Sequence, residues 1–198
     1  LLGILNQVLD LSKIEAGKLT LNLEPCCLNT LIDDIHSAFS TVAHKQGLIL
    51  QTSKDPRIAA VLMMDTLRLR QILQNLLSNA IKFTDRGEIY FSISVLADDH
   101  AGQLIEFRII DTGIGMGTEE IKLALQAFEQ VPGKADQHNG TGLGLTITNH
   151  LVNSMSSQLN FESAPGFGSN IHFCVAFPRT SIAVSKNSLT DRSVTSRK

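Results

Sequence analysis

The stretch from Asp65 to Thr84 carries the clearest periodicity in the chain. Its apolar residues recur at spacings of three and four, as in an amphipathic helix packed on a core: Leu69, Ile72, Leu73, Leu76, Leu77 and Ala80. At about 100° per residue, Asn75, Asn79 and Lys82 fall in one narrow stripe on the opposite face. Asparagine is a poor helix former, so a purely solvated face would more often carry Glu, Lys, Gln or Arg. Two carboxamides and an ammonium on one stripe suit a hard cation with phosphates attached.

Two glycine-rich loops lie further along the chain. Residues 103–110 are rich in β-branched and apolar residues like a buried strand, and they run directly into Asp111–Gly117 (DTGIGMG). Residues 140–145 (GTGLGL) open the next helical pattern. Glycine-rich loops before helices bind phosphate through free backbone N–H groups and the helix dipole. The chain contains no GxxxxGK[ST] P-loop and no HRD or DFG motif of the protein kinases.

The remaining pattern predicts helices and short strands. Helices are expected over residues 1–16, from Asn29 or Thr30 to Val42, over 118–127, and from the Gly140 loop to about Met155. Strands are expected over residues 19–23, 48–52, 60–64, 88–96, 103–110, 159–163 and 170–177, with a break at Pro25 and a turn at Asp55-Pro56. The first helix either packs on the core of its own domain or belongs to a longer helical hairpin.

Composition and charge exclude several classes of protein. The chain has 198 residues, a formal net charge of −2 and a pI of about 6.3, so nothing indicates a nucleic-acid or anionic-membrane surface. Its three cysteines form neither a disulfide framework nor a CxxC metal pattern. No apolar run approaches the length of a membrane span, so membrane insertion of this chain is not expected. From Arg179 onward the chain has almost no large apolar residues and is predicted to be a flexible linker or tail.

Four segments together carry a family resemblance. NLLSNAIKFT, DTGIGMG, AFEQV and GTGLGL, in this order, resemble the N, G1, F and G2 boxes of the ATP-binding domain of bacterial sensor histidine kinases. That domain belongs to the larger group of DNA gyrase, Hsp90 and MutL ATPases. The resemblance extends over residues 1–178 and is closest to hybrid sensor kinases of the BvgS and EvgS type. One departure is Leu125, which stands where the F box usually has its first phenylalanine.

The resemblance implies a Bergerat ATP-binding fold, an α/β sandwich. Its mixed, mostly antiparallel sheet is covered on one face by helices and is preceded by one N-terminal helix. Residues 1–17 would be the second helix of a dimerisation and phosphotransfer hairpin, 18–178 the ATP-binding catalytic domain and 179–198 the linker or tail.

The adenine end of the predicted site centres on Asp111. Its carboxylate is an acceptor that can bind the exocyclic amine of adenine, a donor that guanine lacks at that position. Gly113 and Gly115 remove side chains beside it. The alternative is a turn aspartate that satisfies its own loop. The resemblance assigns Asp111 the adenine role and places Phe83 against the base.

The phosphate end of the predicted site centres on the polar stripe. By resemblance, Asn79 with help from Asn75 would bind Mg2+, and Lys82 would contact phosphate oxygens, so that Asn75 and Lys82 would also be the catalytic residues. The second glycine loop would close over the phosphates through Gly140, Thr141, Gly142, Leu143 and Gly144. Residues 131–139 are predicted to form a lid, in which Lys134 either reaches the γ-phosphate or is solvated.

Kinase activity has three alternatives. A dinucleotide-binding site is disfavoured because the glycines after Asp111 are spaced GxGxG rather than GxGxxG. A hydrolytic ATPase of the same superfamily generally has a glutamate base at the position of Asn75, and asparagine cannot act as that base. A module that binds ATP without transferring its phosphoryl group stays open.

The resemblance also predicts partners for phosphoryl transfer. None of the six histidines is followed by Glu or Asp, so the phosphoacceptor histidine is expected on the helix preceding Leu1, in the dimerisation and phosphotransfer domain of the same protein. A receiver domain or response regulator would then accept the phosphoryl group. The intact protein is expected to be a homodimer, and this chain to be the cytoplasmic domain of an inner-membrane sensor.

Overall fold

Two β-sheets and four helices make up the part of the chain that the structure describes. The structure is a computed structural model, and it describes residues 9, 12, 16–17, 19–126 and 142–180. The strands are β1 Glu24–Cys26, β2 Ile49–Lys54, β3 Leu62–Met64, β4 Glu88–Asp98, β5 Gly102–Asp111, β6 Asn160–Ser163 and β7 Ser169–Pro178. The helices are α2 Leu28–Lys45, α3 Thr66–Lys82, α4 Thr118–Ala124 and α5 Gly144–Ser154.

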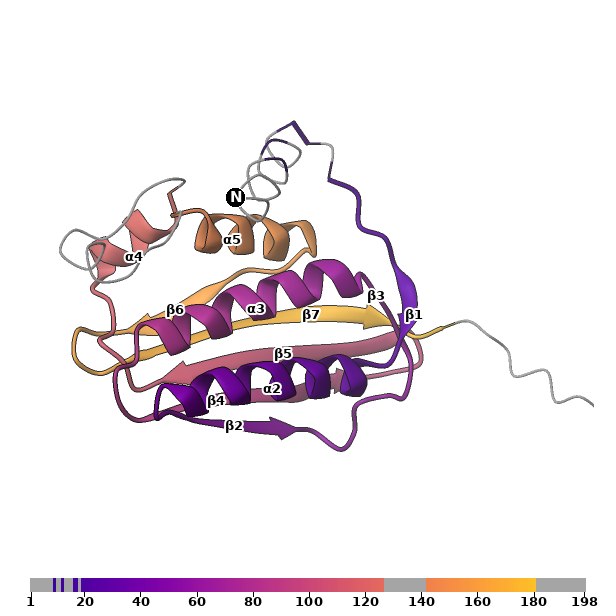
Figure 1. Cartoon of the computed structure of the whole chain (residues 1–198). Helices are drawn as coiled ribbons and strands as arrows, with labels where there is room; N and C mark the ends of the chain where they lie inside the picture. The colour runs from indigo at the N-terminus through magenta and orange to yellow at the C-terminus, as the bar shows by residue number, and fades with distance from the viewer. Residues whose placement is uncertain (1–8, 10–11, 13–15, 18, 127–141, 181–198) are drawn as a thin grey trace, which may run out of the picture.

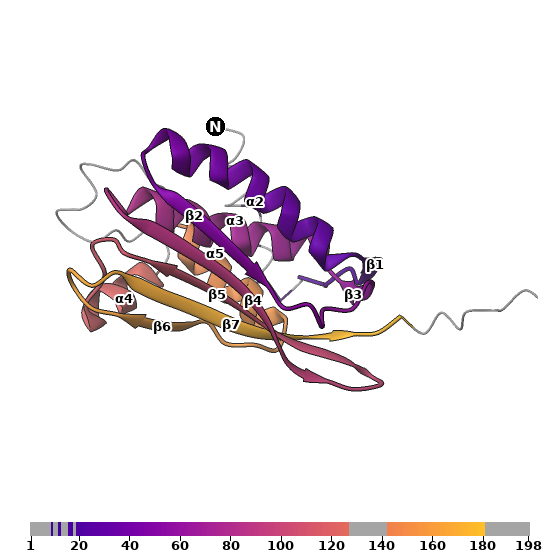
Figure 2. The same cartoon turned by 90° about the horizontal axis from the view of Figure 1, so that it is seen from below.

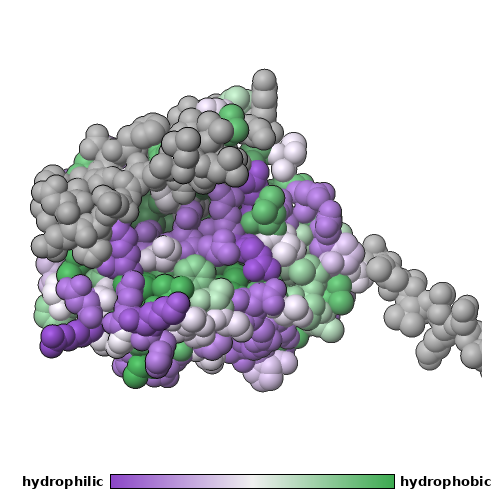
Figure 3. All heavy atoms as spheres, viewed as in Figure 1, coloured by the Kyte–Doolittle hydropathy of each residue, from purple (hydrophilic) through white to green (hydrophobic). Residues whose placement is uncertain are grey.

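The main sheet has five strands in the order β2-β4-β5-β7-β6. Strand β2 runs parallel to β4, whereas the β4–β5, β5–β7 and β6–β7 pairs are antiparallel. Helices α2, α3 and α5 lie over one face of this sheet (Figures 1 and 2). The predicted sandwich with a mixed, mostly antiparallel sheet is therefore confirmed. Hydrophilic residues gather over the middle of the helical face (Figure 3).

The core forms where the apolar stripe of α3 meets the alternating strands. In β4 every second residue is buried, beginning with Ile89 and Phe91, because successive side chains in a strand point to opposite faces. The neighbouring strands continue this layer, with Phe107 of β5 stacked on Phe173 of β7 at a centroid distance of 5.1 Å. All six apolar residues predicted for the inner face of α3 are buried. This packing fixes α3 against the sheet and leaves its polar stripe pointing outward.

The largest differences from the predicted elements lie near the N-terminus. Strand β1 covers Glu24–Cys26 rather than residues 19–23, so Pro25 lies inside a strand and not at a break. A two-stranded sheet tolerates proline because an edge strand need not donate every N–H to a neighbour. Helix α2 begins at Leu28, with Cys27 at the N-cap, rather than at Asn29 or Thr30. The predicted helix over residues 1–16, the lid over 131–139 and the tail over 179–198 lie wholly or largely outside the described residues.

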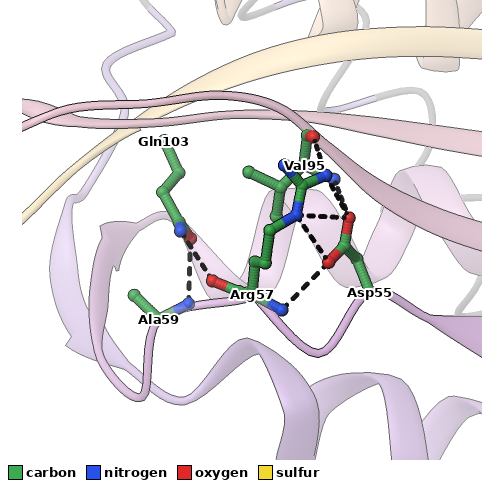
Figure 4. Close-up of polar contacts among 5 residues, drawn as sticks. All are labelled: Asp55, Arg57, Ala59, Val95 and Gln103. Carbon is green, nitrogen blue, oxygen red and sulfur yellow. Dashed lines mark hydrogen bonds and ion pairs between the residues drawn. The ribbon is translucent and has the colours of Figure 1, made fainter.

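A polar clamp fastens the loop between β2 and β3 to the β4–β5 hairpin (Figure 4). The Arg57 guanidinium donates to the Asp55 carboxylate at 2.7 Å and to the Val95 carbonyl at 2.6 Å. This contact holds the pKa of Asp55 well below its usual range. Buried Gln103 accepts from the Ala59 N–H at 2.9 Å and donates to the Arg57 carbonyl at 2.8 Å. The clamp thereby fixes the approach to β3, which leads into α3.

Candidate nucleotide-binding site

Helix α3 presents the polar stripe on its outer side. The helix begins after Asp65, whose carboxylate accepts the Arg68 N–H at 3.0 Å and so satisfies one of the free donors of the first turn. Asn75, Asn79 and Lys82 are all half-buried, whereas the apolar stripe of the helix is fully buried. The structure therefore places the three predicted residues together on one helix at the surface of the core.

Asn75 joins the polar stripe to the second glycine loop. Its Nδ2 atom donates to the Gly144 carbonyl at 3.4 Å and to the Thr148 hydroxyl at 3.3 Å. A carbonyl oxygen only accepts, so the amide nitrogen must face α5. The Oδ1 atom is therefore the atom of Asn75 that is left to act as a ligand.

Asp111 lies buried at the end of β5. Its Oδ1 atom accepts the Gly113 N–H at 2.9 Å, as the turn-aspartate alternative also requires. Burial raises the pKa of Asp111, while hydrogen bonds from the backbone N–H groups of Gly113 and Ser169 act in the opposite direction. A carboxylate held in such a desolvated position benefits from any further donor that reaches it.

The loop after Asp111 is docked on the end of α3. The Ile114 N–H donates to the Phe83 carbonyl at 3.1 Å. A Cβ atom at Gly113 would lie 2.2 Å from that carbonyl oxygen and 2.8 Å from Asp111 Oδ1, so only glycine fits there. The adenine end and the phosphate end of the predicted site are thus joined through Phe83.

Gly115 is constrained in the same way by another turn. It has a φ of +63°, and a Cβ atom there would lie 2.0 Å from the Ala164 carbonyl oxygen. The turn between β6 and β7 closes onto the loop, with the Gly166 N–H donating to the Ile114 carbonyl at 2.7 Å. The predicted glycines Gly113 and Gly115 therefore allow close backbone packing around Asp111.

Lys82 lies over the ring of Phe83. Its Nζ atom is 4.8 Å from the ring centroid, which is a cation–π distance. Burial lowers the pKa of Lys82. An anion placed beside this ammonium would offset the cost of its desolvation.

The second glycine loop is described only in part. Gly140 and Thr141 lie outside the described residues. Gly142 has a φ of +69°, in the left-handed region that favours glycine. The side chain of Leu143 is buried in the core. Gly144 begins α5, and its N-cap residue is Leu143, whose apolar side chain cannot accept a hydrogen bond from the first turn.

A surface hollow of about 600 Å³ lies on the other side of α3, against α2. Phe39, Val42, Ser78 and Ile81 contribute to its walls, as does Lys82. Asn75, Asn79 and Asp111 do not line it. Among the residues predicted for the nucleotide, Asn75 contacts α5, whereas Lys82 lines the hollow.

Two threonines of α5 were not predicted to matter. Thr148 is fully buried and accepts from Asn75, while the buried Thr146 hydroxyl has no hydrogen-bond partner among the described residues. A sequence signal existed, because threonine is a poor helix former and its hydroxyl needs a partner when it lies on an apolar helix face. Two threonines among the apolar residues of one short helix could have been recognised on that ground.

The described residues contain no group of three or more His, Cys, Asp or Glu that could hold a metal ion. A magnesium ion bound through amide and phosphate oxygens needs no such cage. Within the same residues, no helix is both long and apolar enough to cross a membrane.

Comparison with known proteins agrees with this arrangement. The family described as histidine kinase-, DNA gyrase B- and HSP90-like ATPases matches residues 64–179. This match covers α3, both glycine loops and the strands between them, and the chain belongs to this family. The relationship predicted from the four boxes is therefore confirmed.

Several relatives are sensor kinases. The chain is 40% identical over 182 residues to the sensor histidine kinase GacS of Pseudomonas protegens, covering 91% of this chain and 20% of that protein. It is 40% identical over 174 residues to the signal transduction histidine-protein kinase BarA of Escherichia coli, covering 87% and 19%. The chain thus spans about a fifth of the length of these relatives.

A solved structure supports the same fold. The crystal structure of full-length ShkA in complex with AMPPNP aligns with a TM-score of 0.76 and 28% identity. The alignment covers 90% of this chain and 36% of ShkA.

Proposed function

We propose that this chain is the ATP-binding catalytic part of a sensor histidine kinase. One observation carries the proposal. Hydrogen bonds from Asn75 to Gly144 and from Ile114 to Phe83 bring the polar stripe and both glycine loops to one helix. The family of the chain and the AMPPNP bound by its relative ShkA support ATP as the ligand.

At the adenine end, Asp111 would accept a hydrogen bond from the exocyclic amine of the base. Its burial makes that bond valuable, because a desolvated carboxylate gains more from an added donor than a solvated one. Guanine would present a carbonyl oxygen to the same carboxylate and would be repelled. Phe83 would supply an apolar contact to the base, in the position it takes at the end of α3.

At the phosphate end, Lys82 would contact phosphate oxygens. Asn79 and the Oδ1 atom of Asn75 would supply ligands to Mg2+, which bridges and neutralises the phosphates when it is bound. The backbone of Gly142–Gly144 and the first turn of α5 would add N–H donors. Gly140 and Thr141 complete the proposed loop.

The proposed activity is transfer to a histidine and not hydrolysis. Asn75 donates through its nitrogen to α5, and a carboxamide has no basic site with which to activate water. The γ-phosphoryl group would therefore await a histidine of the dimerisation and phosphotransfer domain, and a receiver domain or response regulator would take it next. The sensor kinases among the relatives support this role.

The wider setting is part of the same proposal. Because the chain spans about a fifth of GacS, we infer that it is the domain of residues 18–178 within a longer homodimeric sensor. In that protein it would face the cytoplasm, with the sensing part at the inner membrane. A module that binds ATP without transfer is the second candidate, since no histidine of this chain resembles a phosphoacceptor site.

The first experiment is a calorimetric titration of a non-hydrolysable ATP analogue, with and without Mg2+. The native chain is expected to bind it in a Mg2+-dependent manner. Asp111→Asn should lose affinity by about tenfold or more, as for one charge-assisted hydrogen bond. The control Asp85→Asn removes an exposed carboxylate outside the site and should bind normally. Absence of binding to the native chain would contradict the proposal.

A second experiment separates the two candidates. Labelled ATP is incubated with the native chain and a separately produced helical hairpin that carries the phosphoacceptor histidine. Acid-labile label on the hairpin is expected from a kinase. A chain that binds the analogue yet never labels the hairpin, either separately or in the intact protein, is a binding module.

A further inference from the structure

The carboxylate of Asp65 contacts two separate parts of the chain. Its Oδ1 atom accepts the Arg68 N–H at 3.0 Å, inside the first turn of α3. Its Oδ2 atom accepts the Asn22 N–H at 2.9 Å. Asp65 is only 7% exposed, so both bonds lie largely away from water. One buried side chain therefore joins α3 to the segment of residues 19–23, which we call the incoming segment.

Two further contacts place the incoming segment beside the start of α3. Strand β1 follows it directly and pairs with β3, with Glu24 opposite Met64, the residue before Asp65 (Figure 1). Leu19 at its other end packs against the hydrophobic core. The incoming segment is thus held at both ends, and Asp65 is its polar contact with α3.

Helix α3 carries this connection to the nucleotide site. It runs without interruption from Thr66 to Lys82. At a rise of about 1.5 Å per residue, Asn75 lies about 15 Å and Asn79 about 21 Å along the same helix from Asp65. A packed helix moves as a unit, so a shift at its first turn also shifts the residues that would face Mg2+ and phosphate.

We propose that Asp65 is a positioning residue that couples the incoming segment to the nucleotide-binding helix. The inference rests on the proposed function. The residues before the incoming segment are those that resemble the phosphotransfer hairpin, so a displacement of that hairpin would reach the polar stripe through Asp65. Coupling of this kind is reciprocal, because a site that responds to the segment must also influence it when ligand binds.

Two substitutions break the connection from opposite ends. Asp65→Ser keeps an N-cap oxygen for α3 but has no second oxygen for Asn22. Asn22→Pro removes the backbone N–H and leaves Asp65 intact as the cap. The matched control is Asn22→Ala, which keeps the N–H and removes only the exposed side-chain bond from Asn22 to Glu24 at 2.6 Å.

The test measures amide hydrogen exchange of the incoming segment with and without the ATP analogue and Mg2+. In the native chain and in Asn22→Ala, nucleotide should slow exchange of residues 19–24. In Asp65→Ser and Asn22→Pro that response should fall by about fivefold, as expected for one lost hydrogen bond. The affinity for the analogue should change by less than the response does. In the intact protein, both variants should phosphorylate with a lower kcat and a nearly unchanged KM for ATP.

The outcomes separate the two hypotheses. If the native chain binds no nucleotide, the proposed function fails and the inference falls with it. If nucleotide binds but exchange of the incoming segment does not respond, or responds in Asp65→Ser and Asn22→Pro as strongly as in the native chain, the coupling is refuted and the proposed function stands. If one variant fails to fold, the other decides, because each breaks the same bond.

Discussion

The carboxamide nitrogen of Asn75 lies 3.3 Å from the hydroxyl oxygen of Thr148, a residue 73 positions later in the chain. This contact ties α3 to α5 at the point where the second glycine loop becomes a helix. Thr148 is fully buried and Asn75 is half-buried, so the polar contact lies largely away from water. The position of the second glycine loop beside α3 thus depends on a polar contact between two helices.

Thr148→Val should lower the free energy of unfolding by about 1 kcal/mol, because it removes a hydroxyl that a half-buried amide needs. In an Asn75→Ala background the same substitution should cost much less, and urea denaturation of all four chains gives the coupling energy. Thr146→Val is the matched control. Its hydroxyl has no partner among the described residues, so its loss should not destabilise the chain. Additive effects of Asn75→Ala and Thr148→Val would refute the contact.

Gly113→Ala should destabilise the chain strongly and abolish nucleotide binding. The new Cβ atom would lie 2.2 Å from the Phe83 carbonyl oxygen, which forces the Asp111 loop off the end of α3. A loss of about 2–4 kcal/mol is typical of such a steric conflict. Gly117→Ala, four residues later, meets no atom closer than 3.9 Å and has an ordinary φ of −79°. It should cost about 1 kcal/mol at most, from the weaker N-cap of α4. If Gly113→Ala and Gly117→Ala lowered stability and nucleotide affinity equally, the close packing of Gly113 on Phe83 would be contradicted.

Lys82→Met should weaken binding of the ATP analogue without weakening binding of adenosine. Methionine keeps an apolar stem over Phe83 and removes only the charge, which is proposed to contact phosphates. The affinity for the analogue is expected to fall by about tenfold, as for the loss of one charge-assisted contact. Lys45→Met, at the exposed end of α2, serves as the control. An equal loss of affinity for adenosine would show that Lys82 acts through the base or the fold.

Asp111→Asn should change the free energy of unfolding and the nucleotide affinity in opposite directions, and the change in stability should depend on pH. Burial raises the folded-state pKa of Asp111 above the ordinary value of 3.8, so protonation favours the folded state. The stabilising contribution of this group is present at acid pH and is lost as pH rises through the raised pKa. Relative to the native chain, Asp111→Asn should therefore gain stability between about pH 4 and neutrality while it loses nucleotide affinity.

Denaturant unfolding at several pH values measures this difference. Asp85→Asn removes an exposed carboxylate, and its free energy of unfolding should change with pH as that of the native chain does. A stability difference for Asp111→Asn that shrinks as pH rises would contradict the cause assigned to the pKa shift.

Much of the fold was predictable because its elements have strong local periodicity. Residues 65–84 and 88–111 show helical spacing and strand alternation over long enough stretches that packing only confirms them. Short elements are different. Strand β1 has three residues and no apolar alternation of its own, so its position at Glu24–Cys26 depends on the partner strand β3. The two cysteines and Pro25 suggested a break because nothing local indicates a partner 38 residues away.

The residue types that make up the candidate site were also predictable from the sequence, but the contacts between them were not. Leu143 was expected to close over the phosphates as part of the second glycine loop, and its side chain is buried in the core. Asp65 was recognised only as the start of the central stretch. Its second hydrogen bond, to Asn22, involves a backbone N–H that no residue type reveals.

The sequence by itself determined which residues form α3 and the long strands and which chemical groups its motifs carry, since both depend on residue types at short spacings. Only the tertiary structure decided that Asn75 meets Thr148, that Gly113 packs on the Phe83 carbonyl and that Asp65 reaches Asn22. Each of these contacts joins residues 30 or more positions apart. They form only when the buried faces of the helices and the sheet close on one another, and the path of the chain between them then fixes which polar groups come within hydrogen-bond distance.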